Sequence, residues 1–274
     1  MFNPFSRGSV DWVVQFSGGI SSWAAALLTK RFLVSPGDTF HLLFADTLIE
    51  DEDTYAFIDM AAENLKTPVT RIADGRTPWE VFKDVRFLAN ARIDPCSKIL
   101  KRELLNTYIE DNYVNPSRVI GIGWDEIHRL DRLRERSDHA WVAPLAEPLK
   151  EIPRRFQTPD KLTTLKWAEN EGLPQQRLYK LGFPHANCGG GCVKAGIKHF
   201  QHLYKVMPDR FQEWERGEQE VREFLDKDVA ILRSRKGGTS RPLSLRELRQ
   251  DLEQDKELTS EEELDWGGCG CAIE

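Results

Sequence analysis

The sequence has no long hydrophobic run. No stretch of apolar residues approaches the length of about 20 that a membrane-spanning helix needs. Residues 1–7 also lack the basic-then-apolar arrangement of a secretory signal. We therefore expect a cytoplasmic protein that has no membrane partner.

The sequence is also poor in cysteine and carries no excess of positive charge. Its 38 Lys and Arg residues are outnumbered by 44 Asp and Glu residues, which gives a formal net charge of −6. This balance argues against a non-specific binder of polyanions, although a local basic patch depends on distribution rather than on the total. The five cysteines are an odd number, and in a reducing compartment we expect metal ligands or redox groups rather than a disulfide framework.

Short apolar segments alternate with helical patterns in the first part of the chain. The expected strands are residues 10–16, 40–45, 69–73 and 118–123. This alternation predicts an α/β fold with a doubly wound parallel sheet flanked by helices. From residue 161 onward the pattern becomes mainly helical. We therefore predict a nucleotide-binding α/β domain over residues 1–160 and a mainly helical, cysteine-bearing region over residues 161–274.

A turn rich in glycine and serine follows the first expected strand. Its residues are Ser17, Gly18, Gly19, Ile20, Ser21 and Ser22. Glycines let the backbone approach phosphate oxygens, and the helix that follows adds unpaired N–H groups and the positive end of its dipole. A simple strand-to-helix turn with a serine N-cap would have the same composition. The turn is neither a Walker A loop, since no Lys follows the glycines, nor a Gly-x-Gly-x-x-Gly turn.

The glycine turn and three later segments, in order, resemble the PP-loop ATP pyrophosphatase (adenine nucleotide alpha-hydrolase-like) superfamily. The later segments match its phosphoadenosine phosphosulfate reductase-like branch. They are the Asp-Thr pair Asp46-Thr47, residues 121–129, which are similar to a Gly-x-Arg-x-x-Glu-Ser-x-x-Arg element, and residues 178–188, which are similar to a Leu-Tyr-x-x-Gly-Phe segment. The resemblance implies that the loop holds the pyrophosphate of ATP while a substrate oxygen attacks the α-phosphorus.

Two departures from the family pattern bear on the reaction. Ser21 stands where the family loop often has Asp, and Gly123-Trp124 replaces the Gly-Arg of the branch. Dedicated reductases of this branch generally have a modified loop, because their substrate has no pyrophosphate to leave. The intact Ser17-Gly18-Gly19 therefore favours cleavage of ATP between its α and β phosphates over reduction of a sulfonucleotide.

The resemblance also implies which residues contact the nucleotide. ATP is expected to bind the residues of the glycine turn together with Asp46, Thr47, Gly121 and Gly123. Asp46 ends a strand, where α/β sheets bind ligands, so it is expected to hold Mg²⁺ or a ribose hydroxyl. Arg129 is expected to neutralise phosphate charge. The arginines that follow it, up to Arg136, are equally typical of a solvated helix face.

Three cysteines are candidates for one metal site. Cys188 and Cys192 bracket three glycines, and such a loop can wrap thiolate ligands. The resemblance implies that Cys96 converges on them, as in family members that carry a 4Fe–4S cluster. With Cys96, the predicted catalytic residues are Ser17, Asp46 and Arg129. Lys98 and Lys101 are expected to share the helix face near Cys96, where they would lower a thiolate pKa, contact phosphates or remain solvated.

The C-terminal cysteines leave the metal open. Cys269 or Cys271 would supply a fourth cluster ligand, or both would join Cys188 and Cys192 in a closed Zn²⁺ site. Alternatively, a tail cysteine would be the nucleophile of a reductase. An iron–sulfur cluster is favoured because zinc would leave Cys96 without a role, unless Cys96 is a buried structural thiol.

These residues lead to three hypotheses. The first is an ATP-dependent enzyme that adenylylates a substrate, for sulfur transfer from a donor to a nucleobase or nucleic acid. Basic residues at 129–136 and 154–155 and in an expected basic loop at 233–242 would then bind the acceptor. The second is a phosphoadenosine phosphosulfate or adenylylsulfate reductase that uses thioredoxin. The third is a non-catalytic module that binds a nucleotide and a metal.

Overall fold

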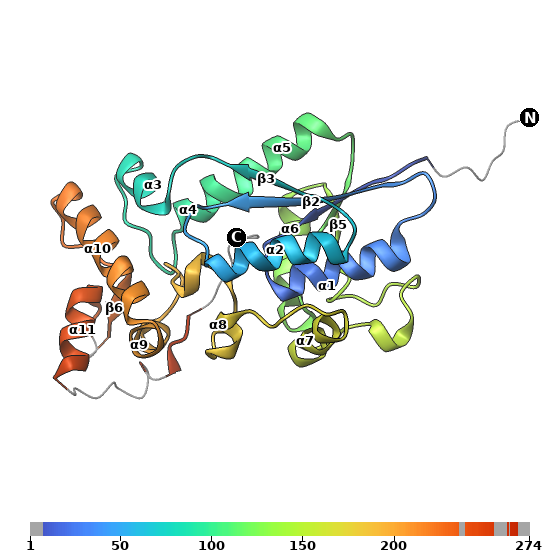
Figure 1. Ribbon diagram of the computed structural model, residues 1–274. Coiled ribbons are helices and arrows are strands. Elements are labelled where there is room, and N and C mark those ends of the chain that lie inside the picture. The colour runs from blue at the N-terminus through green and yellow to red at the C-terminus, as the bar shows by residue number, and fades with distance from the viewer. Residues whose placement is uncertain (1–7, 236–238, 255–261, 263, 268–274) are drawn as a thin grey trace, which may run out of the picture.

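The computed structural model describes residues 8–235, 239–254, 262 and 264–267. A parallel sheet with helices on both sides forms the larger part of the molecule, and helices with a separate hydrophobic core lie at one end of it (Figure 1). Among the described residues, no helix is both long and apolar enough to cross a membrane.

Five parallel strands form the main sheet, in the spatial order β3-β2-β1-β4-β5. The strands are β1 (Asp11–Gln15), β2 (Thr39–Asp46), β3 (Val69–Ala73), β4 (Ser117–Val119) and β5 (Ala140–Val142). In the centre, Val13 of β1 is in register with His41 of β2 and Arg118 of β4. The predicted parallel sheet is confirmed.

The strand order creates a switch point at β1. The chain leaves β1 toward β2 on one side and later places β4 on the other side, so connections diverge from the carboxyl end of β1. Ligands of open α/β sheets bind at such points.

Two strands differ from expectation. β4 ends at Val119, earlier than expected, and residues 120–123 continue as a loop over this end of the sheet. β5 was not expected, because three residues carry too little pattern to identify a strand.

Helices cover both faces of the sheet, as expected for a doubly wound fold. One face carries α1 (Ile20–Leu28), α2 (Glu52–Asn64) and α7 (Lys161–Asn170). There, Trp23 of α1 and Phe57 of α2 are fully buried in one core with Phe44 of β2. The other face carries α5 (Leu104–Asn112) and α6 (Ile127–Arg136). Burial on both faces explains the nearly continuous apolar composition of β1 and β2.

Shorter elements connect these layers. They are the π-helices η1 (Thr29–Leu33) and η2 (Lys98–Glu103), the α-helices α3 (Pro78–Asp84), α4 (Pro95–Ser97) and α8 (Arg177–Lys180), and the 3₁₀-helices η3 (Trp124–Glu126), η4 (Arg154–Phe156) and η5 (Asn187–Gly190). α4, η2 and α5 follow one another without a break. The helix expected near Cys96 therefore forms, but its middle is a π-helix.

The C-terminal region is mainly helical, as predicted. Its elements are α9 (Ile197–Val206), α10 (Pro208–Leu225), β6 (Leu232–Ser234), β7 (Arg241–Leu243) and α11 (Leu245–Glu253). β6 and β7 form an antiparallel pair in which Leu232 lies opposite Leu243. The basic loop expected at residues 233–242 thus includes parts of two strands, because buried leucines at its ends anchor them in the core.

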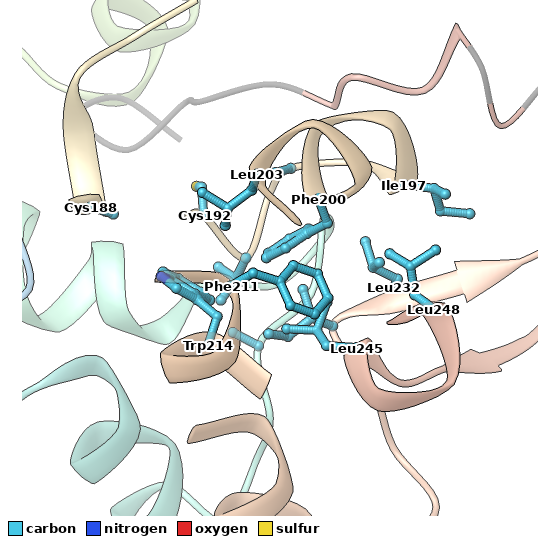
Figure 2. Close-up of a cluster of buried hydrophobic side chains, with 14 of the residues drawn as sticks. Cys188, Cys192, Ile197, Phe200, Leu203, Phe211, Trp214, Leu232, Leu245 and Leu248 are labelled. Carbon is cyan, nitrogen blue, oxygen red and sulfur yellow. The ribbon is translucent and has the colours of Figure 1, made fainter. Parts of the chain in front are cut away.

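This region has its own hydrophobic core. Figure 2 shows Phe200 of α9, Phe211 and Trp214 of α10, and Leu245 and Leu248 of α11 packed together. α7, in contrast, packs on α1 in the core of the sheet. The proposed division of the chain at residue 160 remains a prediction.

One buried carboxylate links the elements of this core. Glu218 of α10 accepts hydrogen bonds from the Ile231 N–H at 2.9 Å and from the Leu245 N–H, the first residue of α11, at 2.6 Å. We expect Glu218→Ala to lower the free energy of unfolding by about 2–3 kcal/mol, because two buried donors lose their acceptor. Urea denaturation followed by circular dichroism measures this loss.

The matched control is Glu220→Ala on the same helix. Glu220 is 62% exposed and pairs with Lys83, so its removal should change stability by about 0.5 kcal/mol or less. Equal urea midpoints for Glu218→Ala and the wild type would show that the hydrogen bonds of Glu218 do not stabilise this core.

Candidate functional site

The glycine turn places the start of α1 at the switch point. Gly19 is the N-cap of α1, with no side-chain cap among the described residues and no acidic residue in the first turn. The N-terminal N–H groups and the positive end of the helix dipole are therefore available to an anion. Gly18 has a φ of +76°, and a Cβ there would lie 2.9 Å from Thr54 Cγ2, so glycine is needed for two reasons. This geometry is that of an anion cradle.

The loop after β4 lies directly on this cradle. A Cβ on Gly121 would lie 2.7 Å from the backbone nitrogen of Ser22 and 2.8 Å from the carbonyl carbon of Ser21. A Cβ on Gly123 would lie 2.6 Å from an oxygen of Asp125. Gly121 therefore allows two backbone segments to touch, and this contact fixes the β4 loop against the start of α1.

An open cavity of about 580 Å³ lies over the cradle. Seven of the predicted nucleotide-site residues line it: Ser17, Gly19, Ser21, Ser22, Gly121, Gly123 and Arg129. Gly18 and Ile20 belong to the turn but do not line the cavity, and Ile20 is buried beneath it. The fold thus brings the glycine turn and the segment 121–129 to one cavity whose size suits a nucleotide.

The serines of the turn have different partners. The Ser22 hydroxyl donates to the Gly19 carbonyl at 2.8 Å, and the Ser17 hydroxyl donates to Ser22 at 3.3 Å. Ser22 therefore holds the turn in shape. Ser21, at the position where the family loop often has Asp, accepts a hydrogen bond from the ammonium of Lys161 at 3.3 Å.

Lys161 is a cavity residue that the sequence did not identify. It is the first residue of α7, and its ammonium lies 4.6 Å from the ring centroid of Tyr179. The residue remains exposed to solvent in the open cavity, but protein atoms crowd the ammonium. This burial lowers the pKa of Lys161 to about 8, while the charges of Glu126 and Asp125 oppose the shift. An anionic ligand would raise this pKa and hold Lys161 in its charged form above pH 8.

Arg129 is a second cation in the cavity. Its side chain is only 13% exposed and donates to the carboxylate of Glu126. Its Nε is buried and has no hydrogen-bond partner among the described residues. Trp124, 50% exposed, lines the same wall and presents an aromatic surface. The wall formed by η3 and α6 therefore offers both a guanidinium and an aromatic ring to a ligand.

Asp46 lies at the end of β2, as expected, but does not line the cavity. One of its oxygens accepts from the Leu48 N–H and the Tyr55 hydroxyl, each at 2.8 Å. The other accepts from Arg71, whose nitrogens lie 3.0 and 2.9 Å away. Both oxygens therefore already have protein partners. The predicted role of Asp46 in catalysis or Mg²⁺ binding is untested and has no support from these contacts.

Thr47 leads to a buried carboxylate that sequence analysis did not select. The Thr47 hydroxyl donates to Glu50 at 3.0 Å, and the Lys101 ammonium lies 3.3 Å from the same oxygen. The other oxygen of Glu50 accepts from the backbone N–H of Cys188. Glu50 therefore joins the Asp-Thr loop to the cysteine loop, and Lys101 extends this link to the cavity, which it lines.

Lys98 and Lys101 do not share a helix face. Lys98 is 62% exposed and lines a different hollow, whereas Lys101 is 11% exposed and lines the cavity. The expected i, i+3 alignment applies to an α-helix. Because η2 is a π-helix, its residues advance through a smaller angle and the two side chains diverge. This segment therefore supplies one lysine to each hollow.

The described cysteines border one core. Cys188 and Cys192 are buried in the core of the C-terminal region (Figure 2), and Cys96 packs against it, partly buried. The backbone of Cys188 is left-handed, with a φ of 55°, and the glycines after it continue the tight turn. The residues just before Cys188, Ala186 and Asn187, line the cavity.

Only some of the predicted metal ligands lie within the described residues. Cys269 and Cys271 lie outside the described residues. Within the part of the chain that the structure describes, no group of three or more His, Cys, Asp or Glu side chains is placed to hold a metal ion. Thiols are the donors that iron–sulfur clusters and Zn²⁺ take, but the arrangement of Cys96, Cys188 and Cys192 does not itself form a ligand set.

The described end of the tail reaches the cavity. Trp266 accepts a hydrogen bond through its carbonyl from the Gly196 N–H at 3.1 Å, and its ring lies edge-on to His199. Gly267 pairs with Ala195 and lines the cavity. A Cβ on Gly267 would lie 2.3 Å from the Lys194 carbonyl oxygen, so only glycine allows this approach.

The contact at Gly121 generates a prediction. We expect Gly121→Ala to lower ATP affinity at least about tenfold, because the added methyl pushes the β4 loop off the start of α1 and disturbs the donors of the cradle. Isothermal titration with non-hydrolysable ATP measures the affinity. Gly8→Ala is the control, because a Cβ there meets no atom within 4 Å. Unchanged affinity in a folded Gly121→Ala variant would exclude this packing as a determinant of binding.

Comparisons with known proteins give limited matches. No protein-family model matches the chain. An uncharacterised protein of Methanocaldococcus jannaschii is 24% identical to this chain over 225 residues. The match covers 82% of this chain but only 44% of that protein, so this chain spans less than half of its relative's length. A solved structure, the U34-tRNA thiolase NcsA from Methanococcus maripaludis with its 4Fe–4S cluster, is 15% identical, with a TM-score of 0.45 over 82% of this chain and 75% of that chain. Neither similarity assigns the chain to a family.

Proposed function

We propose that this chain is a PP-loop enzyme that cleaves ATP to AMP and pyrophosphate and adenylylates a substrate oxygen. The observation that carries the proposal is the cradle itself. The uncapped start of α1, held by Gly121, faces a nucleotide-sized cavity lined by three cationic side chains, Lys101, Arg129 and Lys161. Such a site favours a ligand that carries several negative charges.

The residues of the cavity fit distinct parts of ATP. The N–H groups of the cradle and the Ser21 hydroxyl suit the β- and γ-phosphates, which leave as pyrophosphate. Lys161 and Arg129 would stabilise the charge that grows on this leaving group. The aromatic ring of Trp124 offers a stacking surface to the adenine. A bond forms between the substrate oxygen and the α-phosphorus while the bond to the β-phosphate oxygen breaks, and the substrate proton passes to solvent in the open cavity.

Mg²⁺ fits this site as part of the nucleotide complex. Magnesium is commonly held by one or two carboxylates together with phosphate oxygens and water, so a preformed protein cage is not needed. Asp125 and Glu126 supply carboxylates in the cavity wall. When bound, the ion would neutralise charge on the phosphates.

The finer proposal is that adenylylation prepares sulfur transfer to a nucleobase or nucleic acid. Its support is the position of the cysteine loop, which continues directly from cavity residues Ala186 and Asn187. The thiols of Cys96, Cys188 and Cys192 have the donor chemistry of a cluster, whereas the described residues do not form a complete ligand set. We therefore propose that the sulfur step takes place at this end of the cavity.

A sulfonucleotide reductase is the second candidate. The observation that favours it is the approach of the tail, because Gly267 lines the cavity and the tail cysteines follow it in sequence. Such an enzyme would release sulfite and would need no pyrophosphate leaving group.

Product analysis tests the principal proposal. With ATP labelled at the α-phosphorus and a nucleic acid acceptor, we expect pyrophosphate and an equimolar amount of label on the acceptor, which leaves as AMP when a sulfide donor is added. Gly18→Ala, whose methyl would enter Thr54 and Ile58, should lower this yield at least about tenfold. Gly8→Ala should retain activity. Formation of ADP and phosphate would refute the proposal. Sulfite release from a sulfonucleotide without AMP formation from ATP would establish the reductase instead.

The titration of Lys161 makes nucleotide affinity depend on pH. The lysine has a pKa of about 8 without ligand, and bound phosphates raise it, so binding takes up a proton above pH 8. Affinity for α,β-methylene ATP should therefore be highest below pH 8 and fall about tenfold between pH 7.5 and 9.5.

Two variants isolate this effect. Lys161→Met should bind about tenfold more weakly at pH 7.5, because the ammonium is lost, and should lose most of the pH dependence, because methionine does not titrate. Lys166→Met, which alters an exposed lysine on the same helix, should follow the wild-type profile. A wild-type slope in Lys161→Met would show that Lys161 does not contact the phosphates.

A further inference from the structure

A second hollow, of about 740 Å³, concentrates positive charge in an acidic protein. Five cationic side chains line it against a single carboxylate, that of Asp94: Arg92, Lys98, Arg102, Arg132 and Arg136. The chain as a whole has a formal net charge of −6. We name this surface the basic hollow. Its local excess of cations is the feature that an anionic partner recognises.

Most of these cations are not committed to the fold. Arg132 and Arg136 lie four residues apart on α6, and together with Arg92 they form no ion pair within the described part of the chain. Arg134 on the same helix shows the contrast, because it binds both carboxylate oxygens of Glu147, at 2.6 and 2.8 Å. On α6, Arg129 and Arg134 are therefore paired with carboxylates, whereas Arg132 and Arg136 remain available to a ligand.

The basic hollow also has an apolar lining. Ile93 is 55% exposed, Val85 is 40% exposed, and Phe87 is partly exposed between them in sequence. Inorganic phosphate has no apolar surface that could pack against these side chains. Cations beside an aromatic ring and apolar side chains suit a strand whose phosphates and unstacked bases bind together.

Two helices connect the basic hollow to the cavity of the proposed nucleotide site. On α6, Arg129 lines the cavity and Arg132, three residues later, lines the hollow. On η2, Lys101 lines the cavity and Lys98 lines the hollow. A ligand bound along the basic hollow would therefore lie on one side of the wall that α6 and η2 form, and ATP in the cavity would lie on the other.

We propose that the basic hollow binds the phosphodiester backbone of a single-stranded nucleic acid and presents one of its bases to the cavity. The inference rests on the proposed function, since it names the substrate class of the adenylylation site. Arg132 and Arg136 contact successive phosphates, and the apolar lining receives an unstacked base. The substrate is then recognised outside the cavity, which leaves the cradle to the nucleotide.

Fluorescence anisotropy with labelled single-stranded RNA and DNA oligonucleotides tests this assignment on the full chain. The double variant Arg132→Ala/Arg136→Ala should bind at least about tenfold more weakly than the wild type. The slope of log affinity against log salt should become shallower by about 1.4, because two phosphate contacts are lost. The control Lys150→Ala/Lys166→Ala removes the same charge from exposed positions elsewhere and should bind as the wild type does.

Parallel measurements separate this inference from the proposed function. Arg132→Ala/Arg136→Ala should keep wild-type affinity for α,β-methylene ATP, whereas Gly18→Ala should lose ATP affinity and keep oligonucleotide binding. A chain that binds ATP but no oligonucleotide would overturn the inference and leave the proposed function standing. Competition by mononucleotides or inorganic phosphate at the same concentration of phosphate groups would also overturn it, because the hollow would then be a site for a small anion. Equal losses in both double variants would show that binding is non-specific.

Discussion

The contact of Gly121 with the backbone of Ser21 and Ser22 is the constraint on which the nucleotide site depends. A helix start can serve an anion only if its N–H groups stay uncapped and are held in place. Here the β4 loop supplies the support that a capping side chain would otherwise give. The approach requires glycine, since any Cβ would lie within 2.8 Å of backbone atoms. The strand order brings the two segments together, because β4 is the neighbour of β1.

Much of this arrangement could be predicted from the sequence because its signals are local. Alternating strands and helices predict the sheet, and the glycine turn predicts the cradle. Lys161 could not be predicted, since it is 140 residues from Ser21 in sequence and reaches it only through the packing of α7 on α1. Asp46 shows the opposite case, because its position at a strand end was expected but its partners Tyr55 and Arg71 depend on the fold.

The cysteines and the lysines near them show why residue type alone does not define a site. The sequence identified Cys96, Cys188 and Cys192 as related, and they do border one core. Whether thiols form a ligand set depends on distances that sequence spacing does not fix. Likewise, Lys98 and Lys101 were expected to share one helix face, and a π-helix directs them to different hollows. The π-helix has no sequence signal that we recognised.

The buried pair of Glu50 and Lys101 has a consequence for communication within the molecule. Lys101 borders the cavity, and Glu50 holds the Cys188 N–H. A polyanion that enters the cavity competes with Glu50 for the same ammonium. As the ion pair weakens, the carboxylate becomes a stronger acceptor for the cysteine loop and for Thr47. Occupancy of the cavity and the hydrogen bond to the Cys188 N–H therefore depend on the same carboxylate.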